Sequence, residues 1–182
     1  MKVLNVGSGN RPMPNEKIAE MLKSYFKIEF PPGTKYVNID QLDLGQDCII
    51  DLDKKKLKLP FKDDTFDAVL IVHVLEHIQN IIPLMEELWR VTKPESKCYI
   101  QCPYWTDKWA VGDIDHKRMI NEYTFIWFDQ NCYKNNRLRN TQASPCRVKC
   151  DWRYDIEKDF GFIKNKETEE ITEIVAILTC RK

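Results

Sequence analysis

The sequence has no long hydrophobic run, no excess of charge of either sign, no internal repeat and no low-complexity tract. None of its apolar stretches approaches the roughly 20 residues of a transmembrane helix, so we expect no membrane span. Its 28 basic and 28 acidic side chains cancel to a formal net charge of zero. That balance gives no electrostatic footprint for nucleic acid or a membrane surface. These absences favour a globular protein for which nucleic acid is an unlikely partner.

A secretory signal is also missing at the N-terminus, where no separate apolar segment precedes the first glycine. The seven cysteines are an odd number, which fits free thiols in a reducing compartment and predicts a cytoplasmic protein. Two C-x-x-x-C pairs, CYIQC and CRVKC, lie in segments with the pattern of strands. Four residues of strand span roughly 13 Å, too far for one zinc ion with Zn–S bonds of about 2.3 Å. We therefore expect buried thiols here rather than a zinc site.

What the sequence does contain is an alternation of apolar strands with amphipathic helices. Strands alternating with helices indicate a parallel sheet with helices on both faces, and two final strands without a helix between them indicate an antiparallel hairpin. We expect a single domain over residues 1–182, with a polar loop at 135–144. The predicted strands are 2–6, 35–39, 48–50, 66–72, 97–101, 146–154 and 172–180, and the predicted helices are 15–27, 80–92 and 122–133.

Polar residues or glycines follow each of the first three strands. The first strand runs into a glycine turn in VLNVGSGNRP, the second ends at Asp40, and the third ends at Asp51. Ligands of such sheets bind at the carboxyl ends of the strands. Glycines let a backbone approach a ligand, an aspartate at the second position can accept both ribose hydroxyls, and Asp51 can accept from an amine such as that of adenine. Each feature alone has an ordinary alternative, a tight turn or a solvated aspartate, but together they predict a nucleoside site.

The glycine turn differs from a dinucleotide-binding loop. Asn10 stands where a third glycine would be expected, and the spacing to Asp40 is longer than the usual 20 or so residues. We therefore do not expect a pyrophosphate to bind here.

Several segments resemble the class I S-adenosylmethionine-dependent methyltransferases, specifically the small methyltransferase-type-11-like proteins. They are VLNVGSGNRP, YVNID, DLDKKKLKLPFKDDTFDAVLIVHVLEHI, ELWRVTKP and, more weakly, DIDHKRMINEYTF. The resemblance implies a Rossmann-like, doubly wound α/β fold with a mostly parallel seven-stranded sheet and a C-terminal antiparallel hairpin. It also implies S-adenosyl-L-methionine as the cofactor.

By this resemblance the cofactor lies against nine residues. Gly7, Ser8, Gly9 and His73 would approach the methionine part, Asp40 and Gln41 the ribose, and Asp51 and Leu52 the adenine, with Asn5 at the position where the family usually has an acid. An asparagine can hydrogen-bond the cofactor's ammonium but does not attract it as a carboxylate would, which predicts reduced affinity. The helix that commonly precedes the first strand is absent from the sequence, so we expect an open pocket, or one covered by a partner subunit or a second copy.

Methyl transfer needs a nucleophile in line with an electrophilic methyl group and a group that takes its proton. His116 is the first candidate base, with Asp113 or Asp115 to orient its ring, and Tyr104 is the second. The alternatives are a surface histidine and a packed aromatic ring. Asp113, Asp115 and His116 lack a fourth ligand, so we expect no metal. The D/N-P-P-Y/F signature of base-amine methylation is absent after the fourth strand.

The sequence thus predicts a methyltransferase with an unidentified, small-molecule acceptor. Two alternatives stay open: a non-catalytic module that binds the cofactor and acts with a partner protein, and an enzyme that consumes the cofactor without methylating an acceptor. Binding together with turnover to S-adenosylhomocysteine would separate the first reading from the other two.

Overall fold

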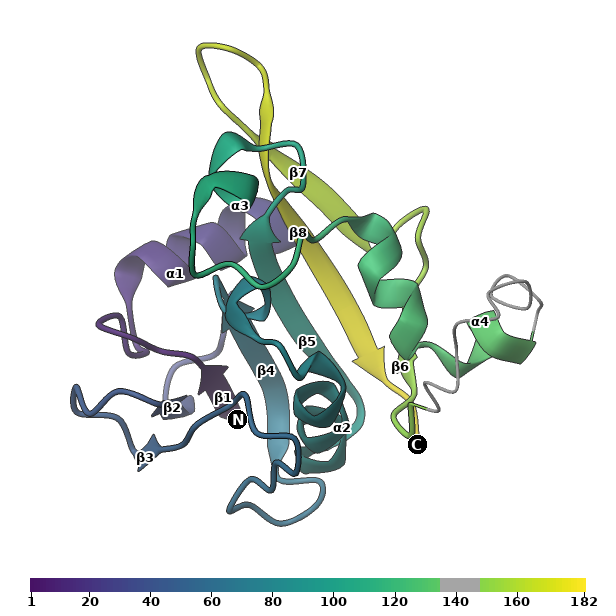
Figure 1. The fold of residues 1–182 in the computed structure, drawn as a ribbon. Coiled ribbons are helices and arrows are strands. Elements are labelled where there is room, and N and C mark those ends of the chain that lie inside the picture. The colour runs from purple at the N-terminus through teal and green to yellow at the C-terminus, as the bar shows by residue number, and fades with distance from the viewer. Residues whose placement is uncertain (135–147) are drawn as a thin grey trace.

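The structure is a computed structural model that describes residues 1–134 and 148–182 (Figure 1). Within these residues eight strands form one sheet in the order β3-β2-β1-β4-β5-β8-β6, with β7 also paired to β8. β1 to β5 run parallel to one another, and β8 is antiparallel to β5, β6 and β7. The strands are β1 (Lys2–Val6), β2 (Lys35–Asp40), β3 (Cys48–Ile49), β4 (Phe66–Val72), β5 (Thr92–Pro103), β6 (Trp152–Arg153), β7 (Phe160–Lys164) and β8 (Ile171–Cys180).

Two helical segments pack on the sheet, and short helical turns lie between its strands. The first segment is α1 (Glu16–Met21), which continues as the wider turn η1 (Leu22–Phe26), and the second is α2 (Ile81–Val91). Asn15 caps α1 by accepting from the backbone N–H groups of Lys17 and Ile18. The short turns are η2 (Leu75–His77), α3 (Lys108–Gly112), η3 (Glu122–Phe128) and α4 (Gln130–Lys134).

Successive residues of the central strands point to opposite faces, and each face has its own buried core. Leu4 of β1 and Val69 of β4 pack in the core that contains α2, whereas Val3 and Leu70 pack in the core that contains α1 and η1. A strand buried on both faces reads as a continuous apolar run, which is the pattern of FDAVLIV. The doubly wound arrangement follows from this two-sided burial.

The predicted fold class is confirmed, with differences near the C-terminus. The sheet has eight strands rather than seven, because β7 was not predicted, and the hairpin is formed by β7 and β8. The strand predicted over 146–154 is reduced to β6 in its described part, and residues 146–147 and the predicted loop 135–144 lie outside the described residues. The helix predicted over 122–133 is divided into η3 and α4 at Asp129.

Burial of the cysteines agrees with the sequence prediction. Cys98, Cys102, Cys150 and Cys180 are buried free thiols, and Cys48 is half-buried. Burial raises the pKa of the Cys98 and Cys102 thiols well above the usual range. No helix in the described part of the chain has the length and apolar character to cross a membrane.

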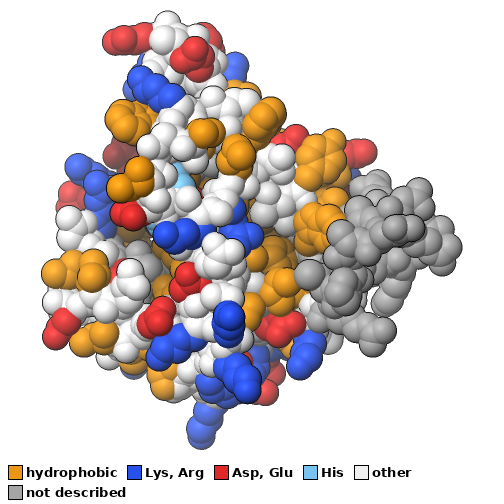
Figure 2. Space-filling model, in the orientation of Figure 1, with side chains coloured by type: hydrophobic (Ala, Val, Ile, Leu, Met, Phe, Trp, Pro, Cys, Tyr) orange, Lys and Arg blue, Asp and Glu red, His pale blue; other side chains and the backbone are white. Residues whose placement is uncertain are grey.

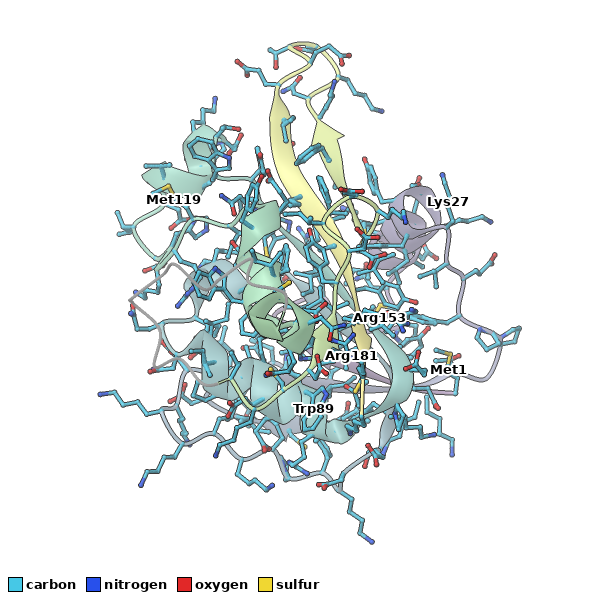
Figure 3. The ribbon with its side chains drawn as sticks, turned by 90° about the vertical axis from the view of Figure 1, so that its right-hand side faces the viewer. Met1, Lys27, Trp89, Met119, Arg153 and Arg181 are labelled. Carbon is cyan, nitrogen blue, oxygen red and sulfur yellow. The ribbon has the colours of Figure 1, made fainter. Side chains whose placement is uncertain are left out.

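The C-terminal residues are fastened to the end of the sheet opposite the glycine turn. Arg181 pairs with Asp129 at 2.5 Å and with Asp151 at 2.6 Å, and the indole N–H of Trp89 donates to the Arg181 carbonyl at 3.0 Å. Figure 3 shows Trp89, Arg153 and Arg181 near one another at this end, with Met119 far from them. The glycine-turn end of the sheet is left for ligands.

Candidate functional site

The glycine turn after β1 combines close packing with an open backbone. Gly7 and Gly9 have φ angles of 64° and 50°, in the left-handed region that favours glycine. A Cβ on Gly7 would lie 2.3 Å from Val74 Cγ2, whereas a Cβ on Gly9 would have no heavy atom within 4 Å. Gly7 therefore allows the turn to pack on Val74, the second residue after β4, and Gly9 exposes backbone to the space beyond.

Asp40, at the end of β2, holds this turn from the other side. Its side chain is buried, with Oδ2 accepting from the Gly9 N–H at 2.8 Å and Oδ1 accepting from the Leu42 N–H at 2.9 Å. A carboxylate oxygen can accept two hydrogen bonds. Each oxygen of Asp40 therefore keeps one acceptor position for hydroxyl groups of a ligand.

Asp40 faces a cavity of about 520 Å³, which we call the strand-end cavity. This volume lies within the range of small-molecule sites. A cavity of about 580 Å³ beside residues 31–33 is larger, but none of the predicted site residues lines it. The strand-end cavity is lined by Gly7, Gly9, Asp40, Gln41, Leu42, Leu52, Asp53, His73, Val74, His77, Ile78, Asp115 and Lys117.

A smaller cavity of about 190 Å³ adjoins the strand-end cavity and shares Gly7, Gly9 and His73 with it. Asn5 and Ser8 line this smaller cavity. The Ser8 hydroxyl is buried and has no hydrogen-bond partner among the described residues. Because a buried hydroxyl without a partner is costly, this group indicates a ligand position.

Asn5 has a structural contact of its own. Its buried side chain donates from Nδ2 to Asn38 Oδ1 at 2.9 Å, and the same oxygen accepts from the Met13 N–H at 2.7 Å. The asparagine that replaces the family's usual acid thus helps to hold the segment after the glycine turn. Its carbonyl oxygen remains the group it can offer to the smaller cavity.

Of the two residues predicted to contact the adenine, Asp51 and Leu52, only one lies at the strand-end cavity. Leu52 lines the strand-end cavity, but Asp51 is exposed and does not line it. Asp51 accepts from the N–H of Asp53, the acid that does line the cavity. Burial opposes ionisation of Asp53, but hydrogen bonds from Asn80 outweigh it and lower the pKa of Asp53. Sequence reasoning selected the acid at the strand end and missed the one two residues later.

His73 stands where three cavities meet, directly after β4 and with a φ of 54°. Its Nδ1 lies 3.4 Å from Glu76 Oε1, and its Nε2 lies 3.6 Å from Glu173 Oε1. Burial opposes its charged form, but the hydrogen bond with Glu76 and the charges of Glu173 and Glu76 outweigh it and raise the pKa of His73. The side chain thus joins the strand-end cavity to the third cavity.

The third cavity, of about 410 Å³, contains His116 and we call it the histidine cavity. The His116 side chain is buried, with Nδ1 3.2 Å from the Ala110 carbonyl and Nε2 3.8 Å from Asp113 Oδ2. Asp113, one of the two acids expected to orient the ring, is thus beside it. The lining residues are His73, Glu76, His77, Pro103, Asp107, Trp109, Asp113, His116, Thr172 and Glu173.

Tyr104 is not among the lining residues of these cavities. Its ring packs edge-on against Phe162, with centroids 4.9 Å apart, and its hydroxyl donates to Glu122 Oε2 at 3.1 Å. Burial, opposed by a hydrogen bond with Trp105 and supported by the hydrogen bond with Glu122, raises the pKa of Tyr104. These contacts give the ring a packing role and make the phenol a poor proton acceptor.

A doubly wound sheet with a glycine turn after β1, a buried acid ending β2 and cavities at that edge is the arrangement in which open α/β sheets bind a nucleoside cofactor. A family model described as a methyltransferase domain, Methyltransf_11, matches residues 4–100, more than half of the chain. The chain belongs to this family. Its cofactor is S-adenosylmethionine, as the sequence predicted.

One curated relative is the demethylmenaquinone methyltransferase of Streptomyces avermitilis, 49% identical over 53 residues. That match covers 29% of this chain and 22% of the relative, so this chain matches only about a fifth of the length of such relatives.

Solved structures share the fold at low identity. A Haloferax volcanii methyltransferase in complex with the Trm112 methyltransferase activator has a TM-score of 0.55 at 13% identity, over 100% of this chain and 83% of that one. An S-adenosylmethionine-dependent methyltransferase of Aquifex aeolicus has a TM-score of 0.52 at 16% identity, over 99% and 82%.

Proposed function

We propose that this chain transfers the methyl group of S-adenosylmethionine to a small-molecule acceptor that enters the histidine cavity. The observation that carries this proposal is the junction at His73. One side of this residue is the strand-end cavity with Asp40, and the other is a separate cavity that can hold an acceptor. A group transfer requires the reacting atoms to approach within about 3–3.5 Å, and two cavities that share His73 and His77 can bring a methyl donor and an acceptor to one junction.

The residues present fit the cofactor. We assign the free acceptor positions of Asp40, with Gln41 beside them, to the ribose hydroxyls, and Leu52 to the adenine. Asp51, exposed at the rim, would contact only an amine that extends out of the cavity. Gly7, Gly9, Asn5 and the partnerless Ser8 hydroxyl lie at the smaller cavity and suit the methionine end. The orphaned hydroxyl of Ser8 is the structural sign that a polar group belongs there.

When bound, the cofactor supplies an electrophilic methyl group on a sulfonium centre. The chain must then orient an acceptor and remove its proton. His116 is the proposed catalytic residue that lines the histidine cavity. With Nδ1 facing the Ala110 carbonyl, its Nε2 carries a lone pair that can take a proton or bind a cation.

A small, partly apolar acceptor fits the surroundings of this cavity. Its volume of about 410 Å³ is that of a small-molecule site. Trp109 lines it and is 65% exposed, and Ile114 nearby is 94% exposed. Figure 2 shows hydrophobic side chains around α3, with the surface of a histidine between them. The Streptomyces avermitilis relative is named for demethylmenaquinone, an apolar quinone.

The same exposed apolar side chains favour a second candidate, a module that binds the cofactor and acts with a partner protein. Patches of this kind commonly mark interaction sites, and the Haloferax volcanii structure pairs a similar fold with an activator. Turnover separates the two candidates, because the module would bind the cofactor without producing S-adenosylhomocysteine.

The test uses methyl-labelled S-adenosylmethionine with a panel of phenols, quinols and hydroxyl-bearing small molecules. We expect labelled acceptor and an equal amount of S-adenosylhomocysteine, with turnover lowered roughly 10²–10⁴-fold in His116→Ala. S-adenosylhomocysteine without labelled acceptor would instead indicate an enzyme that consumes the cofactor. Binding without either product would indicate the module.

A further inference from the structure

All three histidines of the chain gather around one buried carboxylate at the histidine cavity. One ligand atom from each of Glu76, His77 and His116 lies within 4.8 Å of the other two. The rings of His77 and His116 are in edge contact, with centroids 4.8 Å apart. Glu76 and His77 come from η2, directly after β4, whereas His116 comes from the loop after α3.

Glu76 lacks the partners that a buried carboxylate needs. Its side chain is nearly inaccessible, and its oxygens have only long or weak contacts with donors among the described residues. His73 Nδ1 lies 3.4 Å from Oε1, longer than the 2.7–2.9 Å of a charge-assisted hydrogen bond. The Cys102 thiol beside it is a weak donor. Because a buried carboxylate is costly without a firm partner, this position calls for a cation.

The two histidine rings are oriented as metal ligands are. Nδ1 of His77 lies 3.3 Å from the Asp115 carbonyl, and Nδ1 of His116 lies 3.2 Å from the Ala110 carbonyl. Since a carbonyl only accepts, each contact favours the ring with its proton on Nδ1 and a lone pair on Nε2. Asp113 Oδ2 lies 3.8 Å from Nε2 of His116, beyond hydrogen-bond distance. Histidines that bind metals commonly donate their other ring N–H to a backbone carbonyl in this way.

The loop that carries His116 is fixed against η2. The Lys117 N–H donates to the Glu76 carbonyl at 2.6 Å. The Arg118 guanidinium donates to the carbonyls of Ile78 at 2.9 Å and Gln79 at 2.7 Å. These bonds, from the two residues after His116 to carbonyls on both sides of His77, hold the two segments together before any ion binds.

We propose that Glu76, His77 and His116 bind one divalent transition-metal ion, with Zn²⁺ the best match. Two imidazoles and one carboxylate are one of the ligand sets of catalytic zinc sites, which keep a fourth position open, and the same set also binds Fe²⁺ in oxygenases. Mg²⁺ and Ca²⁺ prefer oxygen ligands alone. Ligands about 2.0–2.2 Å from a tetrahedral zinc ion lie roughly 3.4 Å apart, so the cluster closes by small side-chain rotations.

The sequence alone argued against a metal, because Asp113, Asp115 and His116 lack a fourth ligand in their own loop. The fold supplies Glu76 and His77 from a distant segment. Because the three ligands line the histidine cavity, an ion held there would lower the pKa of an acceptor hydroxyl. This last role rests on the proposed function; metal binding itself does not. His116 would then act as a ligand rather than as the base.

The experiment measures zinc binding by the whole chain. Protein freed of metal with a chelator is titrated with Zn²⁺ against a chromophoric competitor, and Co²⁺ substitution reports the ligands by visible absorption. We expect one Zn²⁺ per chain. Glu76→Gln, His77→Gln and His116→Gln should each weaken binding at least about 100-fold, more than loss of an outer-shell partner commonly costs.

Glu173→Gln is the matched control, because Glu173 lines the same cavity on the other side of the His73 ring. It should leave zinc affinity within about threefold of the wild type. Absence of stoichiometric binding in folded wild-type protein, or variants that bind as tightly as the wild type, would overturn the site. S-adenosylhomocysteine affinity, measured on the same metal-free samples, tests the proposed function separately. Circular-dichroism spectra of the same samples check that each variant is folded.

Discussion

At the scale of single residues, substitution of Asp40 is the most direct test of the cofactor assignment. Asp40→Ala removes a charge-assisted contact with the ribose hydroxyls, which should cost about 1.5–3 kcal/mol of binding free energy. That corresponds to roughly tenfold to hundredfold weaker binding of S-adenosylhomocysteine in calorimetry. The fold should survive, although the N–H groups of Gly9 and Leu42 lose an acceptor.

Asp43→Ala provides the control, since Asp43 is an exposed aspartate three residues further along the same loop. Its dissociation constant should equal that of the wild type. Equal losses in both variants would mean that the loop's net charge, rather than a contact of Asp40, attracts the cofactor.

Tyr104→Phe is predicted to affect stability and not turnover. The substitution removes the hydrogen bond to Glu122, which should lower the free energy of unfolding by about 0.5–1.5 kcal/mol in denaturant titration. The ring contact with Phe162 is kept. A turnover loss of 100-fold or more with unchanged stability would restore Tyr104 as a catalytic candidate.

Residues that follow a strand directly were predictable, and those placed by long-range contacts were not. Asp40 and His73 end strands with clear apolar runs, so their arrival at one edge of the sheet follows from the topology. Glu76 and His116 are 40 positions apart in sequence, and only bonds such as that from Lys117 to the Glu76 carbonyl bring them together. No local pattern records that contact.

At the scale of elements, the glycine turn after β1 packs on Val74, the second residue after β4. Replacing each of its two glycines with alanine should therefore lower the free energy of unfolding by different amounts. In Gly7→Ala the left-handed φ costs about 1–2 kcal/mol and the new Cβ also collides with Val74, which adds about 1–3 kcal/mol. Gly9→Ala has the φ cost without a collision. Chemical unfolding should therefore show Gly7→Ala as clearly the less stable variant.

Cofactor affinity, measured on the same two variants, should rank them in the opposite order, with Gly9→Ala the weaker binder. Gly9 opens onto the strand-end cavity, so its new methyl group should weaken S-adenosylhomocysteine binding in folded protein. If Gly9→Ala is as unstable as Gly7→Ala, the collision with Val74 does not add to the destabilisation of Gly7→Ala.

Elements with strong periodicity matched their predictions, and elements shaped by tertiary contacts did not. α2 and β4 lie where the sequence placed them. The helix predicted over 122–133 is interrupted because Asp129 instead accepts from the N–H of Tyr154 and pairs with Arg181. β7 is short and half-buried, and it is a strand because β8 extends far enough to pair with it.

At the scale of the whole molecule, the three cavities at one edge of the sheet form a connected site around His73. Helices on both faces fill the two cores, and the C-terminal residues fasten the opposite end of β8. The cores and the C-terminal ion pairs therefore lie away from the ligand edge, where turns and loops carry the candidate residues. Binding at this edge is linked to the stability of the whole sheet.

That linkage gives a test that needs no acceptor. S-adenosylhomocysteine at 100 times its dissociation constant should raise the free energy of unfolding by about 2.7 kcal/mol. For a chain of this size the midpoint of thermal unfolding should rise by roughly 5–11 °C. NAD at the same concentration should leave the midpoint unchanged, because the turn with Asn10 in place of a third glycine does not suit a pyrophosphate. With roughly tenfold to hundredfold weaker binding, Asp40→Ala should lose between about half and most of the rise at that concentration, which ties the rise to the strand-end cavity. A larger rise with NAD than with S-adenosylhomocysteine would contradict the cofactor assignment, whatever acceptor is later found.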